Sequence, residues 1–231
     1  MIGIIGAMEQ EVNALKELMR VRKSNTIHGY IYYCGTISDK DVVLVQGGIG
    51  KVNATISTTL LLTNYDIDFV INIGSAGGLK SFQNVGDVII SNKVVHHDVD
   101  VTAFGREYGQ VPGLPTYFEA DYELLNIVKS ILSQNNIRSH VGLIASGDQF
   151  ISRSNQVESI INHFPEAMCS EMEAASVAQV CHVFHKRFII TRSLSDVYNK
   201  GDSSIQFDEY LKEASKNSAN MCLELIKSIK Q

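Results

Sequence analysis

Apolar and polar residues follow one another along the chain in blocks that predict strands alternating with helices. Short apolar runs, each closed by Gly, Ser or a polar residue, predict buried strands over 1–6, 42–45, 69–73, 88–90, 141–146 and 188–194. A strand over 30–33 is expected to pair with 42–45 around the turn 38–41. Apolar residues at helical spacing predict helices over 12–19, 51–64, 124–132, 172–184 and 207–229. This order favours a mainly parallel α/β sheet that helices cover on both faces.

One segment, 99–120, does not fit the alternation of strands and helices. It contains Pro112 and Pro115, several glycines and several aromatic residues, and it predicts a long ordered loop. Long loops in compact domains are often functional. No shift of composition and no internal repeat divides the chain, so we expect one domain over 1–231.

Composition and charge narrow the classes of partner. The chain has 231 residues, of which 45% are hydrophobic and 19% charged, which is typical of a globular protein. A net charge of −5 without a long run of Lys or Arg disfavours nucleic acid and anionic membranes as partners. The first residues lack the basic segment of a signal peptide, and no apolar run approaches the roughly 20 residues of a membrane span, which predicts a cytoplasmic protein.

Chemistry-bearing residues follow four of the predicted strands, where ligands bind in sheets of this kind, and precede the predicted helix 172–184. They are Glu9 and Glu11, the glycine-rich run 74–78, the segment 147–151, Glu171 with Glu173, and Ser195 with Asp196. Each feature alone has a simpler interpretation. The glycine-rich run could be a tight turn or an anion cradle, and acids near a helix start favour the helix dipole. Together they predict a site built from acids that lie far apart in the sequence.

A metal site is the alternative that the histidines raise. His96, His97, Asp98 and Asp100, and His182 with His185, are possible ligands. Their spacing does not match patterns such as H-E-x-x-H, and the four cysteines form no C-x-x-C pair. Neither a P-loop nor a G-x-G-x-x-G motif is present. We therefore expect no metal and no cofactor, and reduced cysteines.

Several motifs together resemble the 5'-methylthioadenosine/S-adenosylhomocysteine nucleosidases of the purine nucleoside phosphorylase superfamily. The matching stretches are GIIGAMEQE at 3–11, GIGKVNA at 48–54, NIGSAGG at 72–78, DVTAFG at 100–105, SGDQFI at 146–151, EMEA at 171–174 and RSLSD at 192–196. The resemblance implies a single α/β domain with a twisted mixed central sheet flanked by helices, in a homodimer. It also implies hydrolysis of the N-glycosidic bond of 5'-methylthioadenosine and S-adenosylhomocysteine, with 5'-deoxyadenosine as a further candidate, in methionine salvage and methyl-cycle recycling.

The resemblance also assigns roles to residues. Glu11 would be the base that deprotonates the attacking water, and Asp196 would give or share a proton with adenine N7. Glu173 would bind the ribose hydroxyls. The remaining substrate-binding positions are Ser75 and Arg192 at the water, Met172 at the sugar, Phe150 and the Ile151 backbone at the purine, Ser195 beside Asp196, and Ala7, Met8, Ile49, Gly77 and Phe207 around them. Val101, Phe104 and Pro112 would reach the partner subunit's pocket from the loop 101–112.

The chemistry of the bond is consistent with these roles. Cleavage places positive charge on the ribose and negative charge on the base, so a carboxylate near the sugar and an acid at N7 both help. We expect burial to raise the pKa of Asp196. Arg106 departs from the family, which usually has an aromatic residue there, so Arg106 either favours a charged homocysteine tail or points to solvent.

Two other functions stay open from the sequence alone. A phosphate-dependent purine nucleoside phosphorylase would need cations beside the sugar, whereas Glu9 and Glu11 make the N-terminal loop acidic. A non-catalytic nucleoside-binding protein on the same fold would not need a base that activates water.

Overall fold

The computed structural model describes residues 1–200 and 203–229, and the domain expected over 1–231 therefore includes four residues outside the described part. The strands are β1 (Ile2–Gly6), β2 (Arg20–Ile27), β3 (Tyr30–Ile37), β4 (Lys40–Gln46), β5 (Phe69–Asn72), β6 (Ser75–Gly78), β7 (Val88–His96), β8 (Phe118–Glu119), β9 (Ser139–Ser146), β10 (Ala167–Glu171) and β11 (Arg187–Val197). The helices are α1 (Glu9–Lys16), α2 (Lys51–Asn64), α3 (Tyr122–Gln134), α4 (Ser154–His163), α5 (Ala174–Val183) and α6 (Ser203–Ser228), with a 3₁₀ turn, η1 (Thr102–Phe104).

All the described strands join one mixed sheet in the order β2-β3-β4-β1-β5-β11-β6-β10-β9-β7-β8. β1, β4, β5 and β11 pair in parallel, whereas β2-β3-β4 form antiparallel hairpins. β11 also pairs with β7, which closes β11, β6, β10, β9 and β7 into a ring. The mixed α/β sheet confirms the fold class that the family resemblance implies, whereas the residue pattern alone favoured a mainly parallel sheet.

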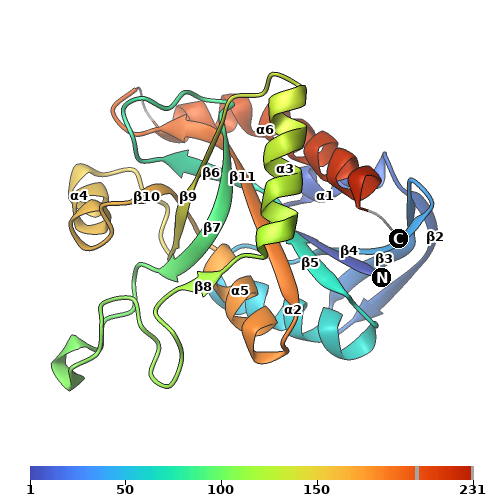
Figure 1. Cartoon of the computed structure of the whole chain (residues 1–231), viewed down its shortest axis with the longest axis horizontal. Helices are drawn as coiled ribbons and strands as arrows, with labels where there is room; N and C mark the ends of the chain where they lie inside the picture. The colour runs from blue at the N-terminus through green and yellow to red at the C-terminus, as the bar shows by residue number, and fades with distance from the viewer. Residues whose placement is uncertain (201–202, 230–231) are drawn as a thin grey trace.

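Helices cover both faces of the sheet (Figure 1). Because side chains alternate along a strand, Ile5 faces the cluster that contains Ala54 of α2 and Ala178 of α5. Ile4 faces the opposite cluster, which contains Leu15 of α1 and residues of α3 and α6. This sandwich fixes the strands and therefore the segments that leave their carboxyl ends. No helix within 1–200 and 203–229 has the length and apolar character that crossing a membrane requires.

Most predicted elements are present, and some bounds differ. α2 begins and ends at the predicted residues, whereas β7 and β11 extend beyond their apolar runs. Ser195 and Asp196 consequently lie within β11 and not after it. The loop 99–120 is ordered and contains only η1 and the two-residue β8. β2, β10 and α4 were not predicted.

The glycine-rich run 74–78 was interpreted wrongly from the sequence. Ser75–Gly78 is neither a tight turn nor an anion cradle but the strand β6, which pairs with β10 and β11. Its glycines allow close approach, since a Cβ at Gly77 would lie 3.1 Å from Asp196 Oδ2. The glycines of this run therefore let the backbone of β6 lie close to the Asp196 carboxyl group.

Candidate active site

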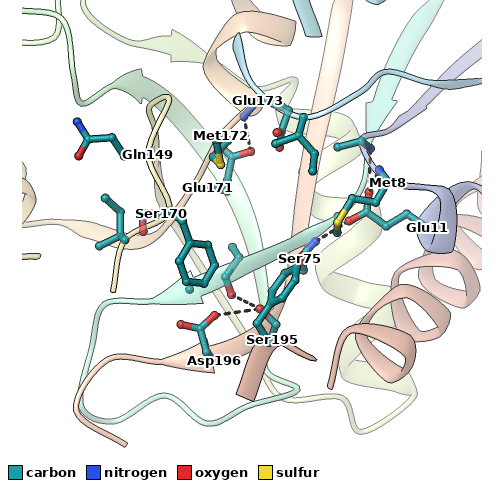
Figure 2. Close-up of a pocket in the computed structure, with 18 residues that line it drawn as sticks. Met8, Glu11, Ser75, Gln149, Ser170, Glu171, Met172, Glu173, Ser195 and Asp196 are labelled. Carbon is teal, nitrogen blue, oxygen red and sulfur yellow. Dashed lines mark hydrogen bonds between the residues drawn. The ribbon is translucent and has the colours of Figure 1, made fainter. Parts of the chain in front are cut away.

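A cavity of about 310 Å³ lies where β1, β5, β9 and β10 end, beside β6 and β11. Its lining includes both predicted catalytic acids and most of the predicted substrate-binding residues. These are Glu11, Asp196, Ala7, Met8, Ile49, Ser75, Gly77, Phe150, Ile151, Met172, Glu173, Ser195 and Phe207. Figure 2 shows Glu11, Glu173 and Asp196 at three separate places around this cavity. The fold therefore brings together the acids that the sequence keeps far apart.

Glu11 is held by the start of α1. The helix begins at Glu9, so the Glu11 side chain turns back toward the free N–H groups that precede the first turn. Glu11 Oε2 accepts hydrogen bonds from Ala7 N at 2.8 Å and Met8 N at 3.0 Å, and Oε1 accepts one from Ser75 N at 3.2 Å. These contacts fix both carboxyl oxygens at the cavity wall.

The protonation of Glu11 reflects two opposing effects. Its side chain is buried, and burial raises its pKa above the ordinary value, although the three backbone N–H groups and the Arg192 guanidinium act in the opposite direction. A raised pKa brings a carboxyl group toward neutral pH, where a base transfers protons most effectively. Glu11 therefore has the environment of a general base.

Arg192 does not line the cavity in this chain but lies beside it. Its guanidinium is fully buried, donates to Glu171 Oε2 at 2.6 Å and to Asn72 Oδ1 at 2.7 Å, and lies near Gly74. A buried pair of this kind is strongly hydrogen-bonded because an unpaired charge would be very unfavourable there. Arg192 therefore supports the cavity wall near Glu11 and Glu171.

From the sequence, Glu171 was interpreted only as an acid near the start of a helix. In the structure its carboxylate forms several hydrogen bonds that organise this part of the site. Its carboxylate accepts from Glu173 N at 3.1 Å and Ala174 N at 2.9 Å, and so satisfies the first N–H groups of α5. Ser146 donates to the same carboxylate. Because Glu171 caps the helix, the Glu173 side chain is free to face the cavity.

Glu173 is a buried acid whose pKa is strongly raised. Its Oε1 accepts a hydrogen bond from Gly50 N at 2.8 Å, and the residue is only 8% exposed. Burial, and after it the negative charge of Glu171, raises the pKa of Glu173 to about 8. This carboxyl group therefore carries a proton over part of the neutral range.

We expect the ligand-free protein to lose stability as the pH rises from 4.5 to about 8. In this window the folded Glu173 retains a proton that the unfolded chain releases, so the free energy of unfolding falls with pH. A single group contributes a slope of at most about 1.4 kcal/mol per pH unit. Urea unfolding at several pH values measures it.

The matched variants for this measurement are Glu173→Gln and Glu158→Gln. Glu173→Gln should reduce the slope, although part of it remains because burial also raises the pKa of Glu11 and Asp196. Glu158 is exposed on α4, so its variant should keep the full slope. Equal slopes in all three proteins would show that Glu173 does not titrate abnormally.

Asp196 is positioned by an irregularity in β11. The register between β11 and β6 shifts between Leu194 and Asp196, and such bulges often re-aim a side chain beside a site. Asp196 is buried, and its Oδ1 accepts a hydrogen bond from Ser195 Oγ at 3.0 Å. Burial raises the pKa of Asp196, against the opposing hydrogen bonds from Ser203 and Ser195. Asp196 therefore holds its proton more readily than an ordinary aspartate does, which is the direction of the pKa change expected from the sequence.

Apolar side chains form the mouth of the cavity. The rings of Phe150 and Phe207 meet edge to face with centroids 5.8 Å apart. Phe150 and Ile49 line the cavity yet remain substantially exposed. Such a surface suits a flat aromatic ring and an apolar substituent.

Three predicted residues lie away from this cavity, in the loop 99–120. They are Val101, Phe104 and Pro112, and Phe104 is 84% exposed. The family resemblance assigned them to a partner subunit's pocket, and that assignment stays a prediction. Arg106 is also exposed in this loop.

Other cavity residues were not predicted to bind substrate, namely Gly74, Ala76, Gln149, Ser170 and Glu171. Most adjoin predicted residues, and glycine at 74 avoids a tight contact, since a Cβ there would lie 3.1 Å from Glu11 Oε1. The histidines are placed elsewhere, and His96 Nε2 lies 2.9 Å from Gln179 Oε1. Among the described residues, no three His, Cys, Asp or Glu side chains gather closely enough to hold a metal ion.

Comparisons with known proteins cover nearly the whole chain. Residues 1–227 match the family model of the phosphorylase superfamily. A 5'-methylthioadenosine/S-adenosylhomocysteine nucleosidase of an Exiguobacterium species is 47% identical over 231 residues, which are 100% of this chain and 99% of that protein.

Solved structures give the same result. The nucleosidase of the same description from Neisseria meningitidis, in complex with methylthio-immucillin-A, is 44% identical with a TM-score of 0.94 and 99% of each chain covered. That of Colwellia psychrerythraea, in complex with adenine, is 41% identical with a TM-score of 0.94, covering 98% of this chain and 94% of the other.

Proposed function

Because this chain belongs to the 5'-methylthioadenosine/S-adenosylhomocysteine nucleosidases of the phosphorylase superfamily, we propose that it hydrolyses the N-glycosidic bond of these two nucleosides. It is an N-glycosyl hydrolase that releases adenine and the thioribose. The observation that carries this proposal is the placement of two acids with raised pKa, Glu11 and Asp196, at different sides of one cavity. One acid of such a pair can act at the base and the other at the sugar of the N-glycosidic bond.

Asp196 acts at the leaving base. As the bond between C1' and N9 breaks, its electron pair moves into the adenine ring, and the proton of Asp196 passes to N7. Ser195 donates to the aspartate and so stabilises its charged form after the transfer. The apolar walls formed by Phe150 and Phe207 receive the purine.

Glu11 acts at the sugar. The ribose develops positive charge at C1', and a water molecule beside Glu11 and Ser75 attacks that carbon. Glu11 takes the proton that the water loses, so one acid gives a proton while the other gains one. Glu173 accepts hydrogen bonds from the ribose hydroxyls, and Met172 packs on the sugar.

Phosphate is a poor nucleophile for this site. The described residues that line the cavity include four acids, Glu11, Glu171, Glu173 and Asp196, and no Lys or Arg. The buried Arg192 is already bonded to Glu171 and Asn72. No cationic side chain among the described lining residues would neutralise a phosphate dianion, so the geometry supports water as the nucleophile.

An adenine-release assay tests the function directly. Methylthioadenosine, adenosylhomocysteine, 5'-deoxyadenosine and inosine are incubated with the enzyme, with and without phosphate. We expect adenine from the first two at rates that do not depend on phosphate. Release only in the presence of phosphate would identify a phosphorylase, and tight binding without any release would identify a nucleoside-binding protein.

We also propose that two copies of the chain form a homodimer in which the loop 101–112 of each covers the other's cavity. Two observations support this arrangement. Phe104 is 84% exposed on that loop, and Val52 on α2 is 68% exposed, close in sequence to Ile49 at the cavity mouth. Large apolar side chains that are strongly exposed can belong to an interface between subunits.

Phe104→Ala should therefore raise the KM for methylthioadenosine by about 10-fold with a smaller change in kcat, because the lost ring covers the 5'-group. The control is Tyr122→Ala, which removes a similarly exposed aromatic ring from the start of α3. Steady-state kinetics measures both.

A mixing experiment locates the loop in the partner. Glu11→Gln subunits keep an intact loop, whereas Phe104→Ala subunits keep intact acids. Dimers that contain one of each should regain sites with the low KM of the unchanged enzyme. If mixing restores nothing although exchange of subunits is seen, Phe104 acts within its own chain.

A further inference from the structure

Three residues outside the cavity, Lys51, Asp98 and Asp148, form a closed ring of hydrogen bonds. Lys51 N donates to Asp148 Oδ1 at 2.7 Å, Asp148 N donates to Asp98 Oδ2 at 3.0 Å, and Lys51 Nζ donates to Asp98 Oδ1 at 2.6 Å. The Lys51 and Asp98 side chains are only 20% and 19% exposed. The ring thus joins the start of α2 to the segments after β7 and β9.

The ring of hydrogen bonds adjoins the substrate cavity at two places. Gly50, directly before Lys51, donates its N–H to Glu173 Oε1 at 2.8 Å. On the other side, Asp148 is followed by Gln149, Phe150 and Ile151, which line the cavity. The ring therefore spans from the acid proposed to hold the ribose to the segment proposed to hold the purine.

The local backbone is shaped for these contacts. Gly50 has a φ of +93°, and a Cβ there would lie 3.0 Å from Asp148 Oδ1. A Cβ at Gly147 would lie 2.5 Å from the His97 imidazole and 3.1 Å from Asp98 Cγ. Glycine at both positions lets the three segments approach closely enough for the ring to form.

We propose that Lys51, Asp98 and Asp148 are positioning residues that fix the purine-binding segment 149–151 relative to Glu173. The base and the ribose of one nucleoside can then be bound at the same time. Lys51 ties the two segments together, because its ammonium pairs with the partly buried Asp98 and its backbone N–H donates to Asp148. Burial raises the pKa of Asp98, but hydrogen bonds from Lys51 and Asp148 outweigh it and lower the pKa, so the carboxylate stays charged. This inference rests on the proposed function.

The test compares a ligand that spans both ends with one that fills only the base end. Calorimetry measures the Kd of methylthio-immucillin-A and of free adenine for the unchanged enzyme and for Lys51→Met, which keeps the apolar stem. Without the ammonium, the segment 149–151 can still shift to bind a free base. It is no longer held at the position where it can bind the base while Glu173 binds the ribose of the same nucleoside. We expect the Kd of the nucleoside analogue to rise about 10-fold and that of adenine less than about 3-fold.

Two further variants separate positioning from folding. Lys51→Arg keeps a cation and should restore most of the difference between the two ligands, whereas Lys129→Met removes an exposed lysine of α3 and should change neither Kd. Asp98→Asn keeps the side-chain shape and should change the two Kd values as Lys51→Met does. It replaces Lys51→Met in the test if the Lys51→Met protein folds poorly. A purely structural role would lower the melting temperature but leave the ratio of the two Kd values unchanged, and that result overturns the inference.

The same experiment shows which proposal has failed. If the unchanged protein binds neither ligand and releases no adenine, the proposed function is wrong and the inference is wrong with it. If it binds both and turns over, but Lys51→Met and Asp98→Asn weaken both ligands equally or not at all, only the coupling between the two ends is wrong.

Discussion

Replacing Glu11 with Gln should lower kcat for adenine release by about 10²- to 10⁴-fold, the usual contribution of a positioned general base. The amide cannot take the proton that the attacking water loses. Its oxygen can still accept from Ala7 N and Met8 N, so the start of α1 keeps two of the three backbone hydrogen bonds. Nucleoside binding should therefore remain within a few-fold of that of the unchanged enzyme.

The measurement pairs turnover with binding. Adenine release is followed spectroscopically, and calorimetry gives the Kd of a nucleoside analogue for the same preparation. Glu9→Gln is the control, because Glu9 lies in the same helical turn but is exposed. Near-normal turnover by Glu11→Gln would exclude Glu11 as the base, whereas loss of both binding and turnover would indicate a damaged cavity.

Asp196→Asn should reduce kcat for methylthioadenosine by a similar factor, about 10²- to 10⁴-fold, because adenine then leaves without a proton at N7. The variant also removes a group whose pKa is raised by burial, so the fall of kcat/KM at alkaline pH should flatten. The exposed Asp208 of α6, next to Phe207, supplies the control variant Asp208→Asn.

A substrate with a different leaving group distinguishes the two acids. A 4-nitrophenyl 5-methylthioriboside releases an anion that is stable without protonation, so Asp196→Asn should cleave it nearly as fast as the unchanged enzyme does. Glu11→Gln should remain slow on it, because the water still needs a base. Equal losses for both variants on this substrate would contradict the separate roles of Asp196 and Glu11.

An element of the fold could be predicted from the sequence where burial leaves apolar residues at helical spacing or in a continuous run. α2 carries apolar residues at helical spacing, and β1 and β5 are continuous apolar runs, so their bounds follow closely. β2 gives no such signal because most of its side chains are exposed and polar. β6 is made of Ser, Ala and Gly, and only its pairing with β10 and β11 makes it a strand.

The location of the site could be predicted in part because Glu11 and the segment 147–151 follow buried strands whose carboxyl ends meet, although Asp196 lies within β11 and β10 was not predicted. The division of work between Glu171 and Glu173 could not, since both acids stand at the start of one helix. Only the structure shows that Glu171 caps α5 and pairs with Arg192, which leaves Glu173 facing the cavity. Likewise, the ring of Lys51, Asp98 and Asp148 joins loops that no local pattern connects.

The two strands at the ends of the sheet order have a consequence for solubility and assembly. An unpaired strand can recruit another chain and start aggregation, unless it is very short or carries charge. Here β8 has two residues, and β2 presents Arg20, Arg22 and Lys23. Both edges therefore discourage association through backbone pairing, so the proposed homodimer would form through helix and loop surfaces, where contact can be reversible and specific.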